Sequence, residues 1–266
     1  SNLFGLAPNF GCCTANFHQG WPKFANSLWM LSGAPDHDRD DGLVAAAYAP
    51  CDVTTLVRGV AVTVTEATDY PFRGAVALTV NPEKPLAFPL HLRIPEWASG
   101  TTIRVNGQSI AAPEPGTFAR VERTWKPGDR VTIDFPMRLR TSRWFNQAVA
   151  VERGPLVFSL QVGENWVKLQ QHGLKSADWQ VFPTHEWNYA LSVDPEHPET
   201  DLAVTETPVG IVPFSAEGAG VRIAARGRQV TSWVADDGAS STLAESPVAS
   251  EATEVRLTLV PYAAGK

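Results

Sequence analysis

The sequence has 266 residues, of which 44% are hydrophobic and 19% charged, as in a globular protein with room for about two domains. Its net charge of −6 and its scattered Lys and Arg residues argue against nucleic acid or an acidic membrane as a partner. No run of about 18 apolar residues predicts a membrane span, and three cysteines are too few for a disulfide framework.

Two adjacent cysteines, Cys12 and Cys13, precede the first predicted helix. Neighbouring cysteines rarely bond to each other, because the small ring that they would close distorts the peptide between them. Two free thiols at a helix entrance, where backbone amides favour a thiolate, fit a metal site or a reactive cysteine. The alternative is two small buried side chains. Nearby His18 is a candidate ligand, although a single histidine is more often structural.

The next element is an amphipathic helix. Its apolar positions are Trp21, Phe24, Ala25, Leu28 and Trp29. This spacing of three and four residues predicts one apolar face, and Gly33 follows the expected end. No second helix of comparable quality follows, so the chain offers that face no obvious partner.

The acidic loop Asp36-His-Asp-Arg-Asp-Asp-Gly42 imitates the opening of a calcium loop. Its glycine comes one place late, and the twelfth position is Ala47 instead of a bidentate glutamate. A solvated surface turn is therefore the better interpretation.

Short alternating segments separated by turn signals follow, which predicts a first antiparallel β-sandwich. These segments cover residues 43–48, 60–66, 75–80, 88–94, 102–105, 118–124 and 130–135. Residues 137–145 are expected to cross to a second sandwich. Its strands are expected at residues 148–152, 156–161, 187–193, 202–205, 221–225, 229–234 and 255–260.

Other catalytic patterns are weak. Glu66 and Asp69 flank a turn, and the simplest role for Arg153 is to balance the charge of Glu152. Spacing alone pairs no two carboxylates for glycosidase chemistry, and no serine triad order, phosphate loop or dinucleotide fingerprint occurs. The cysteine pair is the strongest local candidate for a site.

Several motifs, taken in order along nearly the whole chain, resemble the C-terminal part of glycoside hydrolase family 127, the β-L-arabinofuranosidases. They are Gly11-Cys-Cys-Thr-Ala-Asn16, His18-Gln-Gly-Trp-Pro-Lys23, Tyr48-Ala-Pro50, Thr68-Asp-Tyr-Pro-Phe72, Leu92-Arg-Ile-Pro-Glu-Trp97, Val105-Asn-Gly107, Trp125-Lys-Pro-Gly-Asp129, Val151-Glu-Arg-Gly-Pro-Leu156 and Leu259-Val-Pro-Tyr262.

The resemblance implies a mainly β fold, with two tandem antiparallel β-sandwiches preceded by a terminal helix of an incomplete six-fold α/α barrel. The expected domains are a barrel remnant at residues 1–33, a first sandwich at 34–142 and a second at 143–266. The N-terminus shows no signal-peptide pattern, and the compartment stays open because the true N-terminus is expected upstream.

The resemblance also implies that Cys12 is the catalytic nucleophile of a retaining glycosidase and that Cys12 and Cys13 bind zinc. The other zinc ligands and the acid/base glutamate would belong to the upstream barrel. The expected substrate is an L-arabinofuranoside or a related carbohydrate. Without the barrel, we expect the isolated chain to be inactive and to hold zinc poorly or not at all.

Two other functions remain open on the residues. One is a non-catalytic carbohydrate-binding or structural sandwich, in which exposed tryptophans stack on sugars. The candidates are Trp97, Trp125, Trp144, Trp166, Trp179 and Trp187. The other is a metal-binding or redox protein that uses the vicinal thiols, which lacks a second ligand pair in this chain.

Overall fold

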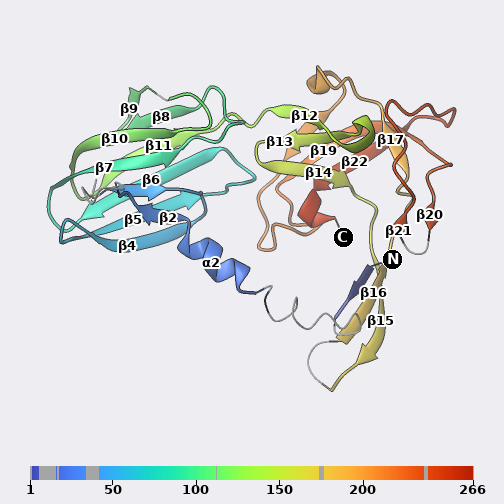
Figure 1. The fold of residues 1–266 in the computed structure, drawn as a ribbon, viewed down its shortest axis with the longest axis horizontal. Helices are drawn as coiled ribbons and strands as arrows, with labels where there is room; N and C mark the ends of the chain where they lie inside the picture. Colours follow the sequence, from blue (N-terminus) through green and yellow to red (C-terminus); the bar gives the residue numbers. More distant parts are fainter. Residues whose placement is uncertain are drawn as a thin grey trace. The chain divides into compact units, whose positions relative to one another are not determined.

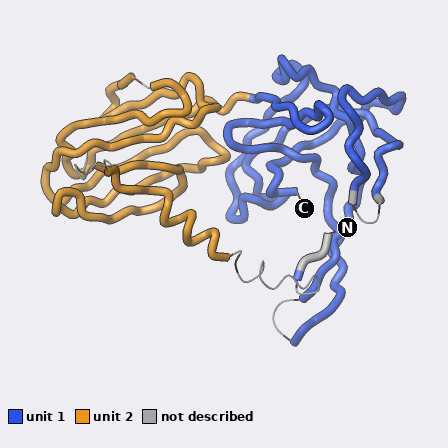
Figure 2. Tube along the Cα trace, in the orientation of Figure 1, with its two compact units in different colours: residues 1–15, 139–266 blue, residues 16–138 orange. Residues whose placement is uncertain are grey.

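The computed structural model describes residues 2–5, 16, 18–33, 42–111, 113–173, 177–236 and 239–265. These residues form a mainly β protein, which confirms the predicted fold class (Figure 1). The chain divides into two compact units, shown in Figure 2. Unit 2 comprises residues 16–138, and unit 1 comprises residues 1–15 and 139–266. The division into units falls after Arg138.

Unit 2 is a sandwich of two sheets. The four-stranded sheet has the order β10 (Phe118–Trp125), β7 (Leu86–Arg93), β3 (Leu43–Ala45) and β2 (Trp29–Leu31). The six-stranded sheet has the order β4 (Cys51–Val57), β5 (Val60–Thr68), β6 (Ala75–Pro82), β11 (Asp129–Asp134), β8 (Thr102–Val105) and β9 (Gln108–Ile110). The described pairs are antiparallel except β3 with β7, which run parallel.

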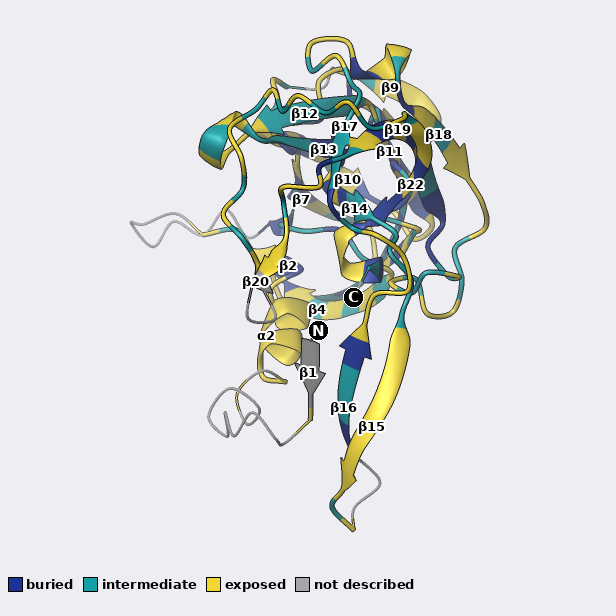
Figure 3. Ribbon diagram, turned by 90° about the vertical axis from the view of Figure 1, so that its right-hand side faces the viewer, coloured by how far each residue is buried: buried dark blue, intermediate teal, exposed yellow. Residues whose placement is uncertain are grey.

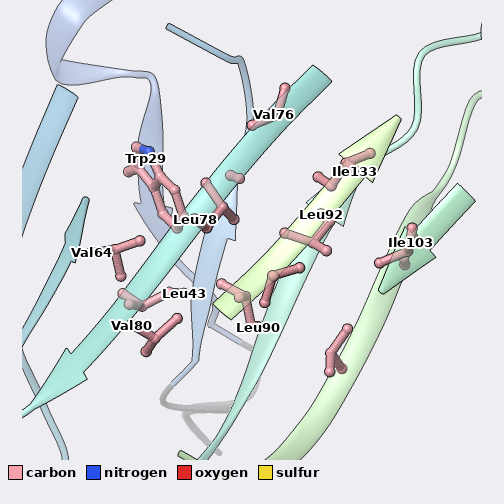
Figure 4. Packing of buried hydrophobic residues seen from close by; sticks show 14 of the residues in the cluster. Trp29, Leu43, Val64, Val76, Leu78, Val80, Leu90, Leu92, Ile103 and Ile133 are labelled. Carbon is pink, nitrogen blue, oxygen red and sulfur yellow. The ribbon is translucent and has the colours of Figure 1, made fainter. Parts of the chain in front are cut away.

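The core of unit 2 follows from the period-two alternation of its strands. In β5, Val60, Val62 and Val64 are buried while the residues between them are more exposed. Such inward positions from both sheets form one cluster of buried side chains (Figure 4). The predicted strands of this sandwich are present, whereas β4 and β9 were not predicted.

The predicted helix is shorter than expected. Helix α2 covers Gly20–Asn26, and none of its residues is buried. Trp29 instead begins β2, which pairs with β3, and its side chain joins the sandwich core. The apolar spacing of Leu28 and Trp29 suits a helix, but burial between the two sheets outweighs helix propensity at these residues.

Unit 1 contains a larger antiparallel sheet and two small ones. The larger sheet has the order β12 (Leu139–Arg143), β13 (Val149–Arg153), β14 (Leu156–Leu160), β22 (Val255–Pro261), β19 (Val221–Gln229) and β17 (Tyr189–Leu191), and β18 (Ala203–Glu206) also pairs with β19. The small sheets are β1 (Asn2–Phe4), β16 (Ala177–Phe182) and β15 (Asn165–Gln171), and the pair β20 (Ala235–Asp236) and β21 (Ala239–Ser240). Single 3-10 turns cover Phe145–Gln147, Pro198–Thr200 and Tyr262–Ala264.

Unit 1 differs from the sequence prediction at several strands. Residues 137–145, which were expected to cross between the sandwiches, contain β12. Residues 230–234 were expected to lie in a strand, but β19 ends at Gln229. The pair β15 and β16 was not predicted. Every residue of β15 is exposed, as Figure 3 shows in yellow, so its sequence carries no inward and outward alternation.

The charge partners around β13 also differ from expectation. Arg153 forms a salt bridge with Glu206 of β18. The buried Glu152 accepts hydrogen bonds from Arg140 and Ser142 of β12. Adjacent residues of a strand point to opposite faces, so Glu152 and Arg153 face different partners.

Among the described residues, no helix has the length and apolar character needed to cross a membrane.

Candidate functional site

The predicted site residues Cys12 and Cys13 lie outside the described residues. His18 lies in the exposed turn before α2. The described part of the chain holds no group of three or more His, Cys, Asp or Glu side chains arranged to bind a metal ion. The acidic loop at residues 36–41 also lies outside the described residues.

Helix α2, which follows the cysteine pair in the sequence, is joined to the sandwich of unit 2 through the residues after its C-terminal end. Leu28 is buried, and its carbonyl accepts hydrogen bonds from the backbone N–H groups of Ala46 and Ala47 at 2.9 and 3.2 Å. Trp21 and Phe24 remain exposed on the helix, with ring centroids 6.0 Å apart. The sandwich therefore fixes the C-terminal end of α2.

A cavity of about 560 Å³ lies between α2 and the start of β4. Its walls come from the helix, the residues that follow it and β4. The lining residues are Trp21, Phe24, Ala25, Asn26, Leu28, Trp29, Ala49, Pro50, Cys51, Asp52, Val53 and Thr54.

Glu66 of β5 contacts three residues of this lining. Its side chain is 3% exposed, and its Oε2 accepts a hydrogen bond from Trp29 Nε1 at 3.0 Å. Its Oε1 accepts from the backbone N–H of Ala49 at 3.0 Å, and Cys51 Sγ lies 3.9 Å from Oε2. A buried carboxylate thus ties β2, the segment before β4 and β4 itself to β5.

Burial sets the protonation of this cluster. Desolvation raises the pKa of Glu66 to about 7, although the N–H groups of Trp29 and Ala49 oppose the shift by favouring the charged form. Burial is the largest cause of the raised pKa of the Cys51 thiol, and the nearby charge of Glu66 adds to the rise. Because a thiol must lose its proton to act as a nucleophile, Cys51 is poorly suited to catalysis at neutral pH.

Glu66 is expected to make the stability of unit 2 depend on pH. Between its unfolded pKa of 4.5 and its folded pKa of about 7, the folded state keeps a proton that the unfolded state has lost. The free energy of unfolding therefore decreases as the pH rises through this window, by about 2 to 3 kcal/mol between pH 5 and pH 8. Urea denaturation at the two pH values measures this difference.

Glu66→Gln should remove the pH-dependent decrease, since an amide does not titrate. It should lower stability at pH 5, because Trp29 or Ala49 loses its acceptor, and its difference from the wild type should be smaller at pH 8 by about 2 to 3 kcal/mol. Glu83→Gln, at an exposed turn, is the control and should keep the decrease. Equal pH dependence in the wild type and Glu66→Gln would contradict this role of Glu66.

Sequence reasoning missed this cluster, but one signal was available. Glu66 continues the inward series of Val60, Val62 and Val64 in the alternation of β5. A carboxylate at an inward position requires buried hydrogen-bond donors. The alternation therefore indicates a buried acid, although it does not identify Trp29 and Cys51 as its neighbours.

The candidate stacking tryptophans separate into core and surface residues. Trp125 is fully buried and Trp97 packs against the same core. Trp179 and Trp187 are half-buried, and each contacts another tryptophan ring. Trp144 and Trp166 are 68% and 38% exposed. These last two are the most accessible of the six.

Residues 42–137 match the family model described as "Beta-L-arabinofuranosidase, GH127 middle domain". No curated protein sequence matches the chain.

The fold is similar to those of solved glycoside hydrolases. Ara127N-Se, a GH127 β-L-arabinofuranosidase from Geobacillus stearothermophilus T6, aligns with a TM-score of 0.64 and 24% identity over 95% of this chain and 35% of that chain. A structure named a glycoside hydrolase aligns with a TM-score of 0.63 and 24% identity over 95% of this chain and 37% of that chain. A GH127 β-arabinofuranosidase aligns with a TM-score of 0.53 and 21% identity over 84% of this chain and 32% of that chain. The chain spans about a third of the length of these proteins.

Proposed function

Since the chain carries the middle domain of glycoside hydrolase family 127 and corresponds to a C-terminal portion of that family, we propose that it is part of a retaining β-L-arabinofuranosidase-type hydrolase. The observation that carries this proposal is the family match at residues 42–137, together with a GH127-like fold over 95% of the chain. The proposed substrate is a β-linked L-arabinofuranoside or a related glycoside.

Cys12 and Cys13 are the proposed site residues. Their support is the motif Gly11-Cys-Cys-Thr-Ala-Asn16, which lies directly before the helix that unit 2 anchors. Cys12 is the proposed nucleophile, and both thiols are proposed zinc ligands. Thiolates suit zinc, but two of them supply only half of a four-ligand site. We therefore propose that an N-terminal α/α barrel contributes the remaining ligands and the acid/base residue.

The chemistry of Cys12 is a double displacement. Its sulfur attacks the anomeric carbon while the bond to the leaving oxygen breaks, which gives a glycosyl thioether with inverted configuration. An acid of the barrel would protonate that oxygen. Water then displaces the sulfur with a second inversion, so the product keeps the configuration of the substrate. Bound zinc would keep the thiol deprotonated at neutral pH.

In this proposal unit 2 has a positioning role. Leu28 and Trp29 join the sandwich directly after α2, so this helix is fixed at its C-terminal end. The buried Glu66 reinforces this attachment through Trp29. A well-positioned nucleophile contributes to rate by avoiding the entropy cost of alignment.

The alternative function is a non-catalytic carbohydrate-binding module. The observation that favours it is the exposed Trp166, which lines a second cavity in unit 1. This function does not compete with catalysis, because a hydrolase can carry both sites.

Zinc content tests the proposed site. We expect the protein encoded with its sequence N-terminal to Ser1 to bind about one zinc ion per chain at this site. Cys13→Ala should reduce zinc to a small fraction of that amount. The isolated 266-residue chain should hold little zinc and release no arabinose from an aryl β-L-arabinofuranoside. Metal analysis of the purified proteins and a chromogenic assay measure both quantities.

Two results would contradict the proposal. One is full zinc content in Cys13→Ala, and the other is turnover by the isolated chain at the rate of the longer protein. Cys51→Ala is the matched control, because it removes the remaining cysteine of the sequence. It should leave the zinc content unchanged.

A further inference from the structure

Unit 1 contains a cavity of about 330 Å³ that the proposed catalytic chemistry does not use. It forms where three segments meet: the residues that link β14 to β15, those that precede β19 and those that follow β22. Its polar lining comes from Gln161, Glu164, Ser215 and Glu217, and its aromatic wall is Trp166. This volume lies at the small end of the range for small-molecule sites.

Trp166 is held in place at the cavity wall. Its Nε1 donates a hydrogen bond to Glu164 Oε2 at 2.7 Å. Its ring meets the Trp179 ring edge-to-face, with centroids 6.2 Å apart and an interplanar angle of 78°. With 38% of the residue still exposed, the indole offers a preordered apolar surface to a ligand.

Other parts of the cavity lining are short side chains and backbone, at Ser215, Ala216, Ala264 and Gly265. Ser215 is fixed by its own contacts, because its Oγ donates to the Val212 carbonyl at 2.9 Å and accepts from the Gly218 N–H at 3.0 Å. At Gly265, an added Cβ would lie 3.0 Å from Ser159 Oγ. Glycine therefore suits a wall where the backbone approaches a neighbouring side chain closely.

The charge of the lining restricts the ligand class. Among the described residues, the lining contains the carboxylates of Glu164 and Glu217 and no Lys, Arg or His side chain. Carboxylates accept hydrogen bonds and repel anions. A phosphorylated or acidic ligand is therefore disfavoured, and a ligand with several hydroxyl donors and an apolar face is favoured.

We propose that this cavity is an accessory carbohydrate site, in which one neutral sugar unit stacks on Trp166 and donates hydroxyl hydrogen bonds to Glu217 and the neighbouring polar groups. The choice of a sugar over another polyol rests on the proposed glycosidase function. The site would hold a glycan near the enzyme without taking part in bond cleavage.

A small organic cation is the competing ligand, since an aromatic ring beside carboxylates also attracts ammonium groups. Two observations favour the sugar. Glu164 already accepts the Trp166 N–H, which reduces its availability for a cation. The amide of Gln161 and the hydroxyl of Ser215 add neutral hydrogen-bonding groups that suit a polyol.

The test is an NMR titration of the 266-residue chain with methyl β-L-arabinofuranoside, and in parallel with methylammonium chloride. The indole N–H resonance of Trp166, assigned by its absence in Trp166→Phe, reports on occupancy. The sugar is expected to shift this resonance saturably. Trp166→Ala should weaken sugar binding by about tenfold, as measured on the remaining shifted resonances. Trp144→Ala, at an exposed tryptophan outside the cavity lining, should bind like the wild type.

Glu217→Gln separates the two ligand classes and does not alter the aromatic wall. Because glutamine still accepts hydrogen bonds, sugar binding should fall by only a few-fold, whereas cation binding would fall by about tenfold or more. A saturable shift with methylammonium but none with the sugar would overturn the proposal. So would equal sugar affinity in Trp166→Ala and the wild type.

These experiments distinguish failure of the accessory site from failure of the proposed hydrolase function. Loss of turnover in Cys12→Ala with no sugar response at Trp166 would overturn only the accessory site. A sugar response at Trp166 in a protein whose turnover survives Cys12→Ala would support the accessory site while removing the nucleophile assignment.

Discussion

Cys12→Ala is expected to lower kcat/KM for an aryl β-L-arabinofuranoside by a factor on the order of 10⁴ to 10⁶ in the protein that includes its N-terminal sequence. The physical reason is that alanine cannot form the covalent intermediate, and loss of a nucleophile in other covalent enzymes costs factors of this size. Steady-state kinetics at several substrate concentrations measure the effect.

Two controls separate a nucleophile from a structural cysteine. Cys51→Ala makes the same chemical change at a protonated, half-buried thiol and should change the rate by no more than a few-fold. Added azide can enter the space that Cys12→Ala leaves and should restore some cleavage, with a glycosyl azide of inverted configuration as the product. Activity within tenfold of the wild type in Cys12→Ala would contradict the assignment.

Trp125→Ala is expected to destabilise unit 2 by about 3 to 5 kcal/mol. Trp125 is fully buried, its Nε1 donates to the Phe88 carbonyl at 2.9 Å, and its ring lies 5.9 Å from that of Phe88. Alanine would leave a cavity in the core and a carbonyl without its indole donor. Urea denaturation, followed by circular dichroism, measures the loss of stability.

The comparison of Trp125 with Trp144 tests whether burial separates core from surface tryptophans. Trp144→Ala removes an exposed ring, whose Nε1 hydrogen bond to Ser142 Oγ is 2.8 Å long, and should cost about 1 kcal/mol or less. Trp125→Phe keeps an aromatic ring and should fall between the two. A change below about 1 kcal/mol in Trp125→Ala would contradict the core assignment and reopen Trp125 as a sugar-stacking residue.

The sequence predicts best where one face of a strand is buried. In β5 the inward valines alternate with more exposed residues, so the strand could be predicted from its pattern alone. Strand β15 has no buried face, and the short β2 follows a segment with helical spacing. Both strands are defined by backbone pairing with the following strand, β15 with β16 and β2 with β3, and an alternation of apolar residues does not contain that information.

In the candidate site too, some features follow from neighbouring residues in the sequence and others only from the fold. The chemistry of Cys12 and Cys13 was suggested by two adjacent residues and a family resemblance. The cluster of Trp29, Cys51 and Glu66 is assembled by the pairing of β4 with β5 and by a buried side-chain hydrogen bond from β2. These contacts join residues from separate strands, so only the fold reveals that Glu66 is buried beside a thiol.

The most direct test of the proposed function is the mass of the peptide that contains Cys12 after rapid acid quenching of the protein, with its N-terminal sequence, during turnover of an activated β-L-arabinofuranoside. The account predicts that this peptide gains the mass of one anhydropentose, and that fragmentation places the sugar on Cys12. A sugar adduct on another residue would contradict the account. So would an unmodified Cys12 peptide under conditions in which deglycosylation is confirmed to be the slow step.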